Sequence, residues 1–232
     1  MIYICEYDGL ADDAVLQERC EALLLPFGGE QTDSVKWKKH RERILARLLL
    51  AYALKSEYGL TFEELGLCRT EHGKPYSSFC PQIRFNLSHC SIACAAVVGE
   101  CETGIDIEQK FPYRANLARK ICHPDERTAL QGMSEGKKEE QLPFLWSLKE
   151  SFVKWQGTGL SYGMDRINLA GHMPFDVKEE GRCRIPYGDL HFLLCSEPAY
   201  TLAVCSEHTE MEMRRISELS LMQDGQDWQG RI

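Results

Sequence analysis

Hydrophobic positions recur along this chain with the two periods that distinguish helices from strands. In the stretch 145–157, apolar side chains return every three to four residues and share one stripe: Leu145, Leu148, Phe152 and Trp155. Gly157 follows this stripe, and a glycine at that place is a typical helix end. The pattern therefore predicts an amphipathic helix that packs on a core and ends near Gly157.

Glu150 and Lys154 lie one turn apart, on the side of this helix that faces away from the apolar stripe. On one interpretation they form an exposed ion pair, which stabilises a helix by about 0.2–0.5 kcal/mol. On the other interpretation they belong to a site that residues elsewhere in the chain complete. The helix by itself does not decide between the two.

The same patterns predict the other elements. We expect a strand at 2–7, a long helix from about 34 to 58, a strand pair over 83–98 and a strand at 104–108. Between 109 and 143 we expect exposed helices with a charged loop at 132–141.

An internal similarity predicts two halves. Residues 83–100 and 190–207 align without a gap and share five identical residues. We therefore predict an α+β fold of two similar halves related by a pseudo-twofold axis, each a long helix packed on a small antiparallel sheet. The N-terminal half is expected at 1–102 and the C-terminal half at 103–222. Residues 223–232 are expected to be a disordered tail.

Composition narrows the class of protein. Hydrophobic content of 44% and charged content of 27% in 232 residues are typical of a soluble globular protein. A net charge of −8 argues against a general nucleic-acid binder, and no apolar run is long enough to span a membrane. Eleven cysteines occur without a C-x-x-C pair, which favours reduced thiols in a cytoplasmic protein over a zinc site.

Two carboxylates alternate with isoleucines in Gly104-Ile-Asp-Ile-Glu108. In a strand this places Asp106 and Glu108 on one face, about 6–7 Å apart. Two such carboxylates repel each other unless a cation lies between them. A third carboxylate would complete an oxygen-rich site of the kind that Mg²⁺ prefers. The alternative is a solvated strand face.

Arg41 and His89 are further candidates for binding an anion. Arg41 falls in the apolar sector of the helix over 34–58, where a charge is expensive without a partner. It is either a snorkelling arginine or a ligand for phosphate or carboxylate. Ser88 and His89 lie in the turn of the strand pair, where a histidine is more often a solvated residue.

Four motifs, in this order and spacing, resemble the 4′-phosphopantetheinyl transferase family. They are Gly73-Lys-Pro75, Asn86-Leu-Ser-His89, Gly104-Ile-Asp-Ile-Glu108, and Trp146-Ser-Leu-Lys-Glu-Ser-Phe-Val-Lys154 with Gly157-x-Gly-Leu-Ser161. The spacing is similar to the surfactin-synthetase-activating (Sfp-type) branch, whose members are monomers of two halves. The resemblance implies transfer of 4′-phosphopantetheine from coenzyme A to a serine of an apo acyl or peptidyl carrier protein, with release of 3′,5′-ADP.

The resemblance also implies roles for individual residues. Asp106, Glu108 and Glu150 match the Mg²⁺ carboxylates, and Mn²⁺ is expected to substitute. Residues that match the coenzyme A contacts are Ser88, His89, Lys154, the segment Gly73, Lys74 and Pro75, and an arginine at or beside Arg41 and Arg43. Glu150, Lys154 and His89 are the expected catalytic residues.

Two other classes of function remain open. One is a Mg²⁺-dependent hydrolase of a nucleotide diphosphate, which would use the same carboxylates and need no carrier protein. The other is a non-catalytic homologue that binds coenzyme A or a carrier domain. An intact set of three carboxylates argues against the second, because a scaffold has no use for a metal site.

Overall fold

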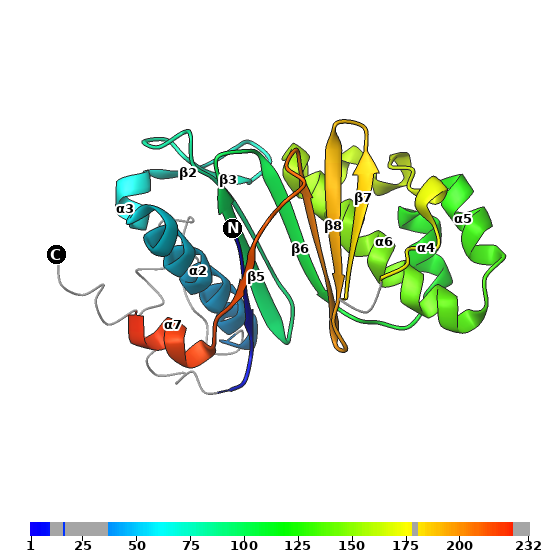
Figure 1. Ribbon diagram of the computed structural model, residues 1–232, viewed down its shortest axis with the longest axis horizontal. Helices are drawn as coiled ribbons and strands as arrows, with labels where there is room; N and C mark the ends of the chain where they lie inside the picture. Colours follow the sequence, from blue (N-terminus) through cyan, green and yellow to red (C-terminus); the bar gives the residue numbers. More distant parts are fainter. Residues whose placement is uncertain (10–15, 17–36, 178–180, 225–232) are drawn as a thin grey trace. The chain divides into compact units, whose positions relative to one another are not determined.

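A computed structural model describes residues 1–9, 16, 37–177 and 181–224 (Figure 1). The chain is a mixed α+β protein whose contacts divide it into two compact units. Unit 1 contains Met1–Glu102 together with the residues from Glu210 onward, and unit 2 contains Thr103–Thr209. Among the described residues, no helix is long and apolar enough to cross a membrane.

Unit 1 is built on a four-stranded sheet in the order β10-β1-β5-β4. These strands are β10 (Met213–Arg215), β1 (Ile2–Glu6), β5 (Ala93–Gly99) and β4 (Arg84–His89). β5 pairs antiparallel with both β1 and β4, whereas β10 joins β1 in parallel. The helix α2 (Trp37–Tyr58) packs against β5. It confirms the long helix predicted from about 34 to 58, over the residues that the structure describes. The residues from 34 to 36 lie outside the described ranges.

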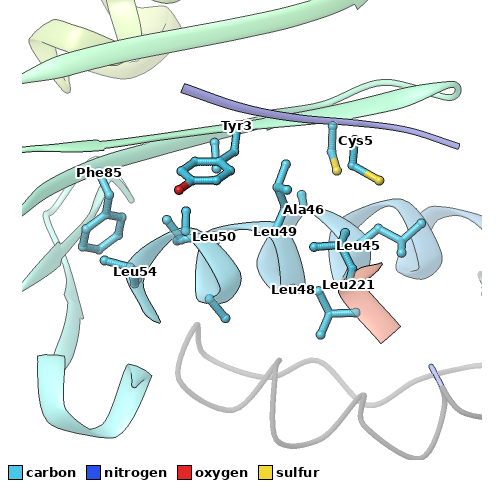
Figure 2. Close-up of a cluster of buried hydrophobic side chains, with 14 of the residues drawn as sticks. Tyr3, Cys5, Leu45, Ala46, Leu48, Leu49, Leu50, Leu54, Phe85 and Leu221 are labelled. Carbon is cyan, nitrogen blue, oxygen red and sulfur yellow. The ribbon is translucent and has the colours of Figure 1, made fainter. Parts of the chain in front are cut away.

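The core of unit 1 lies between α2 and the sheet. Figure 2 shows leucines of α2 directed toward Tyr3 and Cys5 of β1, with Phe85 of β4 beside them. Leu45, Leu49 and Tyr3 are all fully buried. Such burial of apolar area, at about 25 cal/mol per Å², holds α2 on the sheet.

Smaller elements complete unit 1. They are α3 (Phe62–Leu65), the two-stranded hairpin of β2 (Leu67–Arg69) and β3 (Pro75–Ser77), and α7 (Glu218–Asp224). α3 begins with a capping box between Thr61 and Glu64, which satisfies backbone N–H groups at the helix start. α7 lies beside the N-terminal end of α2 (Figure 1).

Unit 2 repeats the sheet-and-helix arrangement with four antiparallel strands in the order β6-β9-β8-β7. The strands are β6 (Thr103–Gln109), β9 (Tyr200–Ser206), β8 (Leu190–Ser196) and β7 (Arg182–Tyr187). The helix α6 (Glu135–Gln156) packs on β6 and β9. The other elements are α4 (Ala115–Ile121), α5 (Pro124–Gln131), and the short helices η3 (Gly159–Tyr162), η4 (Met164–Arg166) and η5 (Ala170–His172).

The two units share a connection order. In each unit, the described part of the chain runs from a first strand through a long helix to a pair of strands. The last strand of that pair lies beside the first strand. β1, β5 and β4 in unit 1 thus correspond to β6, β9 and β8 in unit 2. This agrees with the alignment of 83–100 with 190–207. A pseudo-twofold relation between the units stays a prediction.

The structure differs from two expectations. Residues 210–222 pack with unit 1 and not with the C-terminal half, because β10 pairs with β1 and α7 contacts α2. The expected loop at 132–141 is helical from Glu135 onward. There Lys138 and Lys137 pair with Glu135 and Glu140, one turn away, and so support the helix. Gln223 and Asp224 of the expected tail end α7, and the rest of that tail lies outside the described residues.

α6 and β6 approach each other unusually closely at Gly104. A Cβ atom on this residue would lie 2.0 Å from the backbone oxygen of Ser151 and 2.3 Å from the backbone nitrogen of Trp155. Only a residue without a side chain fits there. The contact brings the carboxylates of β6 next to the middle of α6.

Candidate active site

Asp106 and Glu108 project from the same face of β6, as the alternation predicted, while Ile105 and Ile107 are buried on the other face. This face is not solvated, however, because α6 covers it. Asp106 is only 5% exposed and Glu108 is half-buried. The interpretation of this stretch as a solvated strand face is therefore wrong.

Glu150 and Lys154 reach the same place from α6. Leu145 and Leu148 on the opposite side of the helix are fully buried and hold its orientation. The ammonium group of Lys154 donates a hydrogen bond to Oδ1 of Asp106, with an N–O distance of 2.8 Å. Lys154 thus pairs with a residue of β6, whereas the exposed ion pair considered above would join two residues of the helix. Gly157, at φ 74°, ends the helix one turn later as predicted.

Burial, with the charges of neighbouring carboxylates added to it, raises the pKa values of two of the three carboxylates. Burial is the main cause that raises the pKa of Glu150 to about 7, and the charges of Asp106 and Glu108 add to it, while Lys154 acts in the opposite direction. Burial and then the charge of Asp106 also raise the pKa of Glu108. Carboxylates in this state favour a cation or a proton nearby.

Trp146 is a site neighbour that the sequence analysis left unassigned. Its side chain hydrogen-bonds to the carboxyl of Glu108, as does the backbone N–H of Gln109 at 3.1 Å. Trp146 lies one helical turn before Glu150, and this spacing is the sequence signal that could have placed it beside the site.

The donor set suits a hard divalent cation, although the side chains do not form a closed cage. Among the described residues, no three His, Cys, Asp or Glu side chains are arranged as they stand to hold a metal ion. Mg²⁺ usually takes one or two carboxylates and completes its shell with water and substrate phosphate. Asp106 and Glu108, with Glu150 close enough to feel both charges, fit that requirement.

A second lysine of α6 has a different environment. Lys149 is fully buried and its ammonium group lies 2.5 Å from Oε2 of Glu126, which is also fully buried. It donates further to the backbone oxygens of Ile121, Met164 and Ile167, at 2.8 to 3.1 Å. Glu126 in turn accepts from the backbone N–H groups of His123 and Leu169. This pair ties α4, α5 and η4 to α6 next to Glu150.

In unit 1, Arg41 binds a carboxylate of the chain itself. Its guanidinium lies 3.1 Å from Oε1 of Glu218 on α7 and 5.8 Å from the centre of the Tyr7 ring. The side chain of Arg41 is 18% exposed and that of Glu218 is fully buried. Arg43 is exposed. The structure therefore gives Arg41 an anionic partner within the chain.

His89 faces the first turns of α2. Its Nδ1 atom is 3.7 Å from Oε2 of Glu42, the residue that follows Arg41. Ser88 and His89 are the last residues of β4 and not part of the turn, and Ser88 is buried. Glu42 is a second residue that the sequence analysis missed.

The segment Gly73–Pro75 forms the turn between β2 and β3, with the N–H of Gly73 donating to the oxygen of Thr70. The ammonium group of Lys74 pairs with Glu102, which also lies 3.8 Å from Arg84. Arg84 begins β4 and His89 ends it. This segment is therefore held at the other end of the strand from His89.

Comparison with known proteins agrees with the geometry. Residues 102–206 match the 4′-phosphopantetheinyl transferase superfamily. A 4′-phosphopantetheinyl transferase of Bacillus subtilis is 28% identical over 212 residues, which are 86% of this chain and 92% of that protein. The 4′-phosphopantetheinyl transferase Sfp of Bacillus subtilis is 26% identical over 86% of this chain and 90% of its own length.

A 4′-phosphopantetheinyl transferase of Bacillus pumilus is 29% identical over 183 residues, which are 74% of this chain and 76% of that protein. The matched superfamily region contains β6 and α6, and hence Asp106, Glu108, Glu150 and Lys154. The chain is therefore similar to 4′-phosphopantetheinyl transferases of the Sfp type over most of its length, and it is a transferase enzyme.

Proposed function

We propose that this transferase moves the 4′-phosphopantetheine group of coenzyme A to a serine hydroxyl of an apo acyl or peptidyl carrier protein. The observation that carries the proposal is the cluster of Asp106, Glu108, Glu150 and Lys154, which β6 and α6 hold together at the close contact of Gly104. Carboxylates beside a lysine suit the charge of a pyrophosphate and of its cation.

In the proposed reaction the serine oxygen attacks the β-phosphorus of coenzyme A. A new P–O bond joins the serine to phosphopantetheine, and the bond between the β-phosphorus and the bridging oxygen breaks. The electron pair of that bond leaves on 3′,5′-ADP. The hydroxyl proton passes to Glu150 or to a water molecule that Glu150 holds.

Glu150 is the residue best suited to take this proton. It is half-buried on α6 and burial raises its pKa to about 7. A base with a pKa near the working pH combines a useful population of the ionised form with useful basicity. A cation bound to the same carboxylate would lower its basicity. The proton would then pass to the water molecule that Glu150 holds.

Lys154 stabilises the charge that develops on the leaving group. Its side chain is 27% exposed, and its ammonium group lies at the carboxylate cluster, where a flexible side chain can exchange Asp106 for a phosphate oxygen. Asp106, Glu108 and Glu150 would hold Mg²⁺ or Mn²⁺, which supplies charge neutralisation of the pyrophosphate.

The residues of unit 1 are proposed to bind coenzyme A itself. Arg41 or Arg43 and His89 offer donors for phosphate, Ser88 offers a hydroxyl, and Gly73, Lys74 and Pro75 offer backbone for the adenine. A monomeric state and a cytoplasmic location remain predictions.

Mass spectrometry tests the proposal directly. An apo carrier protein is incubated with this chain, coenzyme A and Mg²⁺. A mass gain equal to phosphopantetheine, with 3′,5′-ADP in the supernatant, supports transfer. Free phosphopantetheine without a gain in carrier mass would indicate a hydrolase instead. Intact coenzyme A with several different apo carriers would leave only a binding role.

A further inference from the structure

A cavity of about 410 Å³ lies in unit 2, where the residues that follow β6 meet the N-terminal half of α6. Its lining combines apolar rings with charged side chains: Lys110, Phe111, Pro112, Glu139, Glu140 and Pro143. Pockets for small ligands have volumes of about 300–1,000 Å³. A protein partner usually covers about 800 Å² of surface instead. The cavity therefore suits a small molecule or a flexible chain better than a folded domain.

The cavity continues the seam between β6 and α6 that holds the carboxylates. Gly104 contacts α6 near the C-terminal end of the helix, and there is no room for a side chain there. Further along, Glu108 contacts Trp146, and Lys110 then lines the cavity together with Pro143. Strand and helix thus run in opposite directions. The carboxylates lie between a closed end of the seam at Gly104 and an open end at the cavity.

Pro143 interrupts the hydrogen bonding of α6 at the cavity. Because proline has no N–H group, the backbone oxygen of Glu139 cannot accept the helical hydrogen bond that residue 143 would otherwise donate. A proline inside a helix costs about 3 kcal/mol and is therefore uncommon. Glu139 lines the cavity itself. The sequence thus places a backbone acceptor at the cavity, beside apolar rings and the exposed Lys110.

The pantetheine arm of coenzyme A has the matching chemistry. In the proposed reaction this arm is bonded to the β-phosphorus, and it carries two methyl groups, a hydroxyl, two amides and a thiol. Glu108 and Lys110 are two residues apart, about 7 Å along a strand, so an extended arm that starts at the carboxylates reaches the cavity. An amide N–H of the arm suits the backbone oxygen of Glu139, and the methyl groups suit the ring of Phe111.

We propose that this cavity is the subsite for the pantetheine arm of coenzyme A, in which the backbone oxygen of Glu139 accepts a hydrogen bond from an amide of the arm. The proposal rests on the proposed function, which puts the β-phosphorus at the carboxylates. Pro143 is then a specificity-determining residue, because any other residue at this position would donate its own N–H to the same oxygen from within the helix.

The test compares coenzyme A with adenosine 3′-phosphate 5′-diphosphate, which keeps the nucleotide and both 5′-phosphates but lacks the arm. Calorimetric titration in the presence of Mg²⁺ gives the Kd of each compound without turnover. Pro143→Ala supplies an N–H group to the helix and removes the proline ring. We expect it to weaken the binding of coenzyme A about fivefold, as for the loss of one neutral hydrogen bond, and to leave the binding of the nucleotide unchanged.

A change at an exposed position covers the case in which Pro143→Ala does not fold. Pro112→Trp puts a larger ring into the cavity, so it should also weaken coenzyme A and spare the nucleotide. The matched control is Pro186→Trp, the same substitution at an exposed proline of β7 that does not line the cavity. It should change the binding of neither compound.

The outcomes separate the subsite from the proposed function. Equal weakening of both compounds in Pro143→Ala or Pro112→Trp overturns the proposal, and so does unchanged binding of coenzyme A in either variant. A raised KM for an apo carrier protein with unchanged binding of coenzyme A would assign the cavity to the carrier protein instead. If the two variants lose coenzyme A selectively but the wild type transfers nothing to an apo carrier protein, the subsite stands and the proposed function is refuted.

Discussion

α6 carries two lysine–carboxylate pairs that use the same chemistry in opposite ways. Lys149 and Glu126 are both fully buried, and the backbone oxygens of Ile121, Met164 and Ile167 accept the other hydrogen bonds of Lys149. The side chain of Lys154 is 27% exposed and reaches across to the side chain of Asp106, which is 7% exposed. The first pair is closed by the protein. The second is partly exposed, and we propose that it meets a ligand.

The difference teaches that sequence spacing does not separate a structural ion pair from a functional one. Lys149 stands next to Glu150 in the chain, yet the helical turn directs the two side chains to different surroundings. Burial lowers the pKa of Lys149, and Glu126 beside it acts in the opposite direction. At the open pair, burial raises the pKa of the neighbouring Glu150.

Breaking the closed pair should have the largest effect on stability. Lys149→Met leaves Glu126 charged and buried without its cation, which typically destabilises a protein by about 3–5 kcal/mol. Adding Glu126→Gln should recover at least about 1 kcal/mol, because a neutral amide needs no cation. Urea unfolding curves measure both. Equal stability of Lys149→Met and the wild type would contradict the structural role.

Separating β6 from α6 should have the second largest effect on stability. Gly104→Ala places a Cβ against the backbone of Ser151 and Trp155, and such overpacking destabilises by about 1–3 kcal/mol. Transfer should fall as well, since the carboxylates move away from α6. Gly99→Ala at the end of β5 is the control, because a Cβ there meets nothing within 4 Å. Similar melting curves for the two variants would argue against the close contact.

Breaking the open pair should change activity far more than stability. Lys154→Met should lower the free energy of unfolding by less than about 1 kcal/mol, as for other partly exposed pairs. Transfer should slow at least about tenfold through the lost charge-assisted contact to phosphate. Lys137→Met, which breaks the exposed pair with Glu140 on the same helix, should change neither. Unfolding and single-turnover transfer report the two effects.

Glu150→Gln sharpens the contrast further. Stability should change by less than about 0.5 kcal/mol, because a neutral amide is easy to accommodate where burial already disfavours the charged carboxylate. Transfer should slow about 10²-fold or more through loss of the base. The measurement is single-turnover transfer at saturating coenzyme A and Mg²⁺, with a melting curve beside it. A near-normal rate of transfer would contradict a catalytic role and support the interpretation of Glu150 as a surface residue of the helix.

Removing the metal should leave the fold unchanged. EDTA should abolish transfer without moving the melting temperature of the protein alone, and Mn²⁺ should restore transfer. Asp106→Ala and Glu108→Ala should each lose activity and the calorimetric signal of Mn²⁺ binding. Full activity in EDTA would refute the metal proposal.

The sequence alone predicted the local features of the site well. Alternation in Gly104–Glu108 placed both carboxylates on one face, and the apolar stripe of α6 fixed which side Glu150 and Lys154 take. Both are short-range patterns that the backbone geometry imposes. The burial of Asp106 was not predictable in this way, because it depends on a helix some forty residues away.

Long-range partners account for the other differences. Glu218 and Arg41 meet through the return of the chain to unit 1, and no periodicity signals such a pairing. The stretch 132–141 resembled a loop because it is rich in Lys and Glu. It is helical from Glu135 onward since Gln141 is anchored by both polar atoms of its amide to the backbone of Phe175.

The return of the chain to unit 1 has a consequence for synthesis. Unit 2 is one continuous segment, whereas unit 1 needs residues on both sides of it. Domains generally fold as units during translation, starting from the N-terminal one. Here unit 1 cannot be completed before unit 2 is translated. The edge of β1 that pairs with β10 stays unpaired until β10 emerges from the ribosome. Chaperone dependence should therefore concentrate at β1, because its second partner, β10, is translated only after the whole of unit 2.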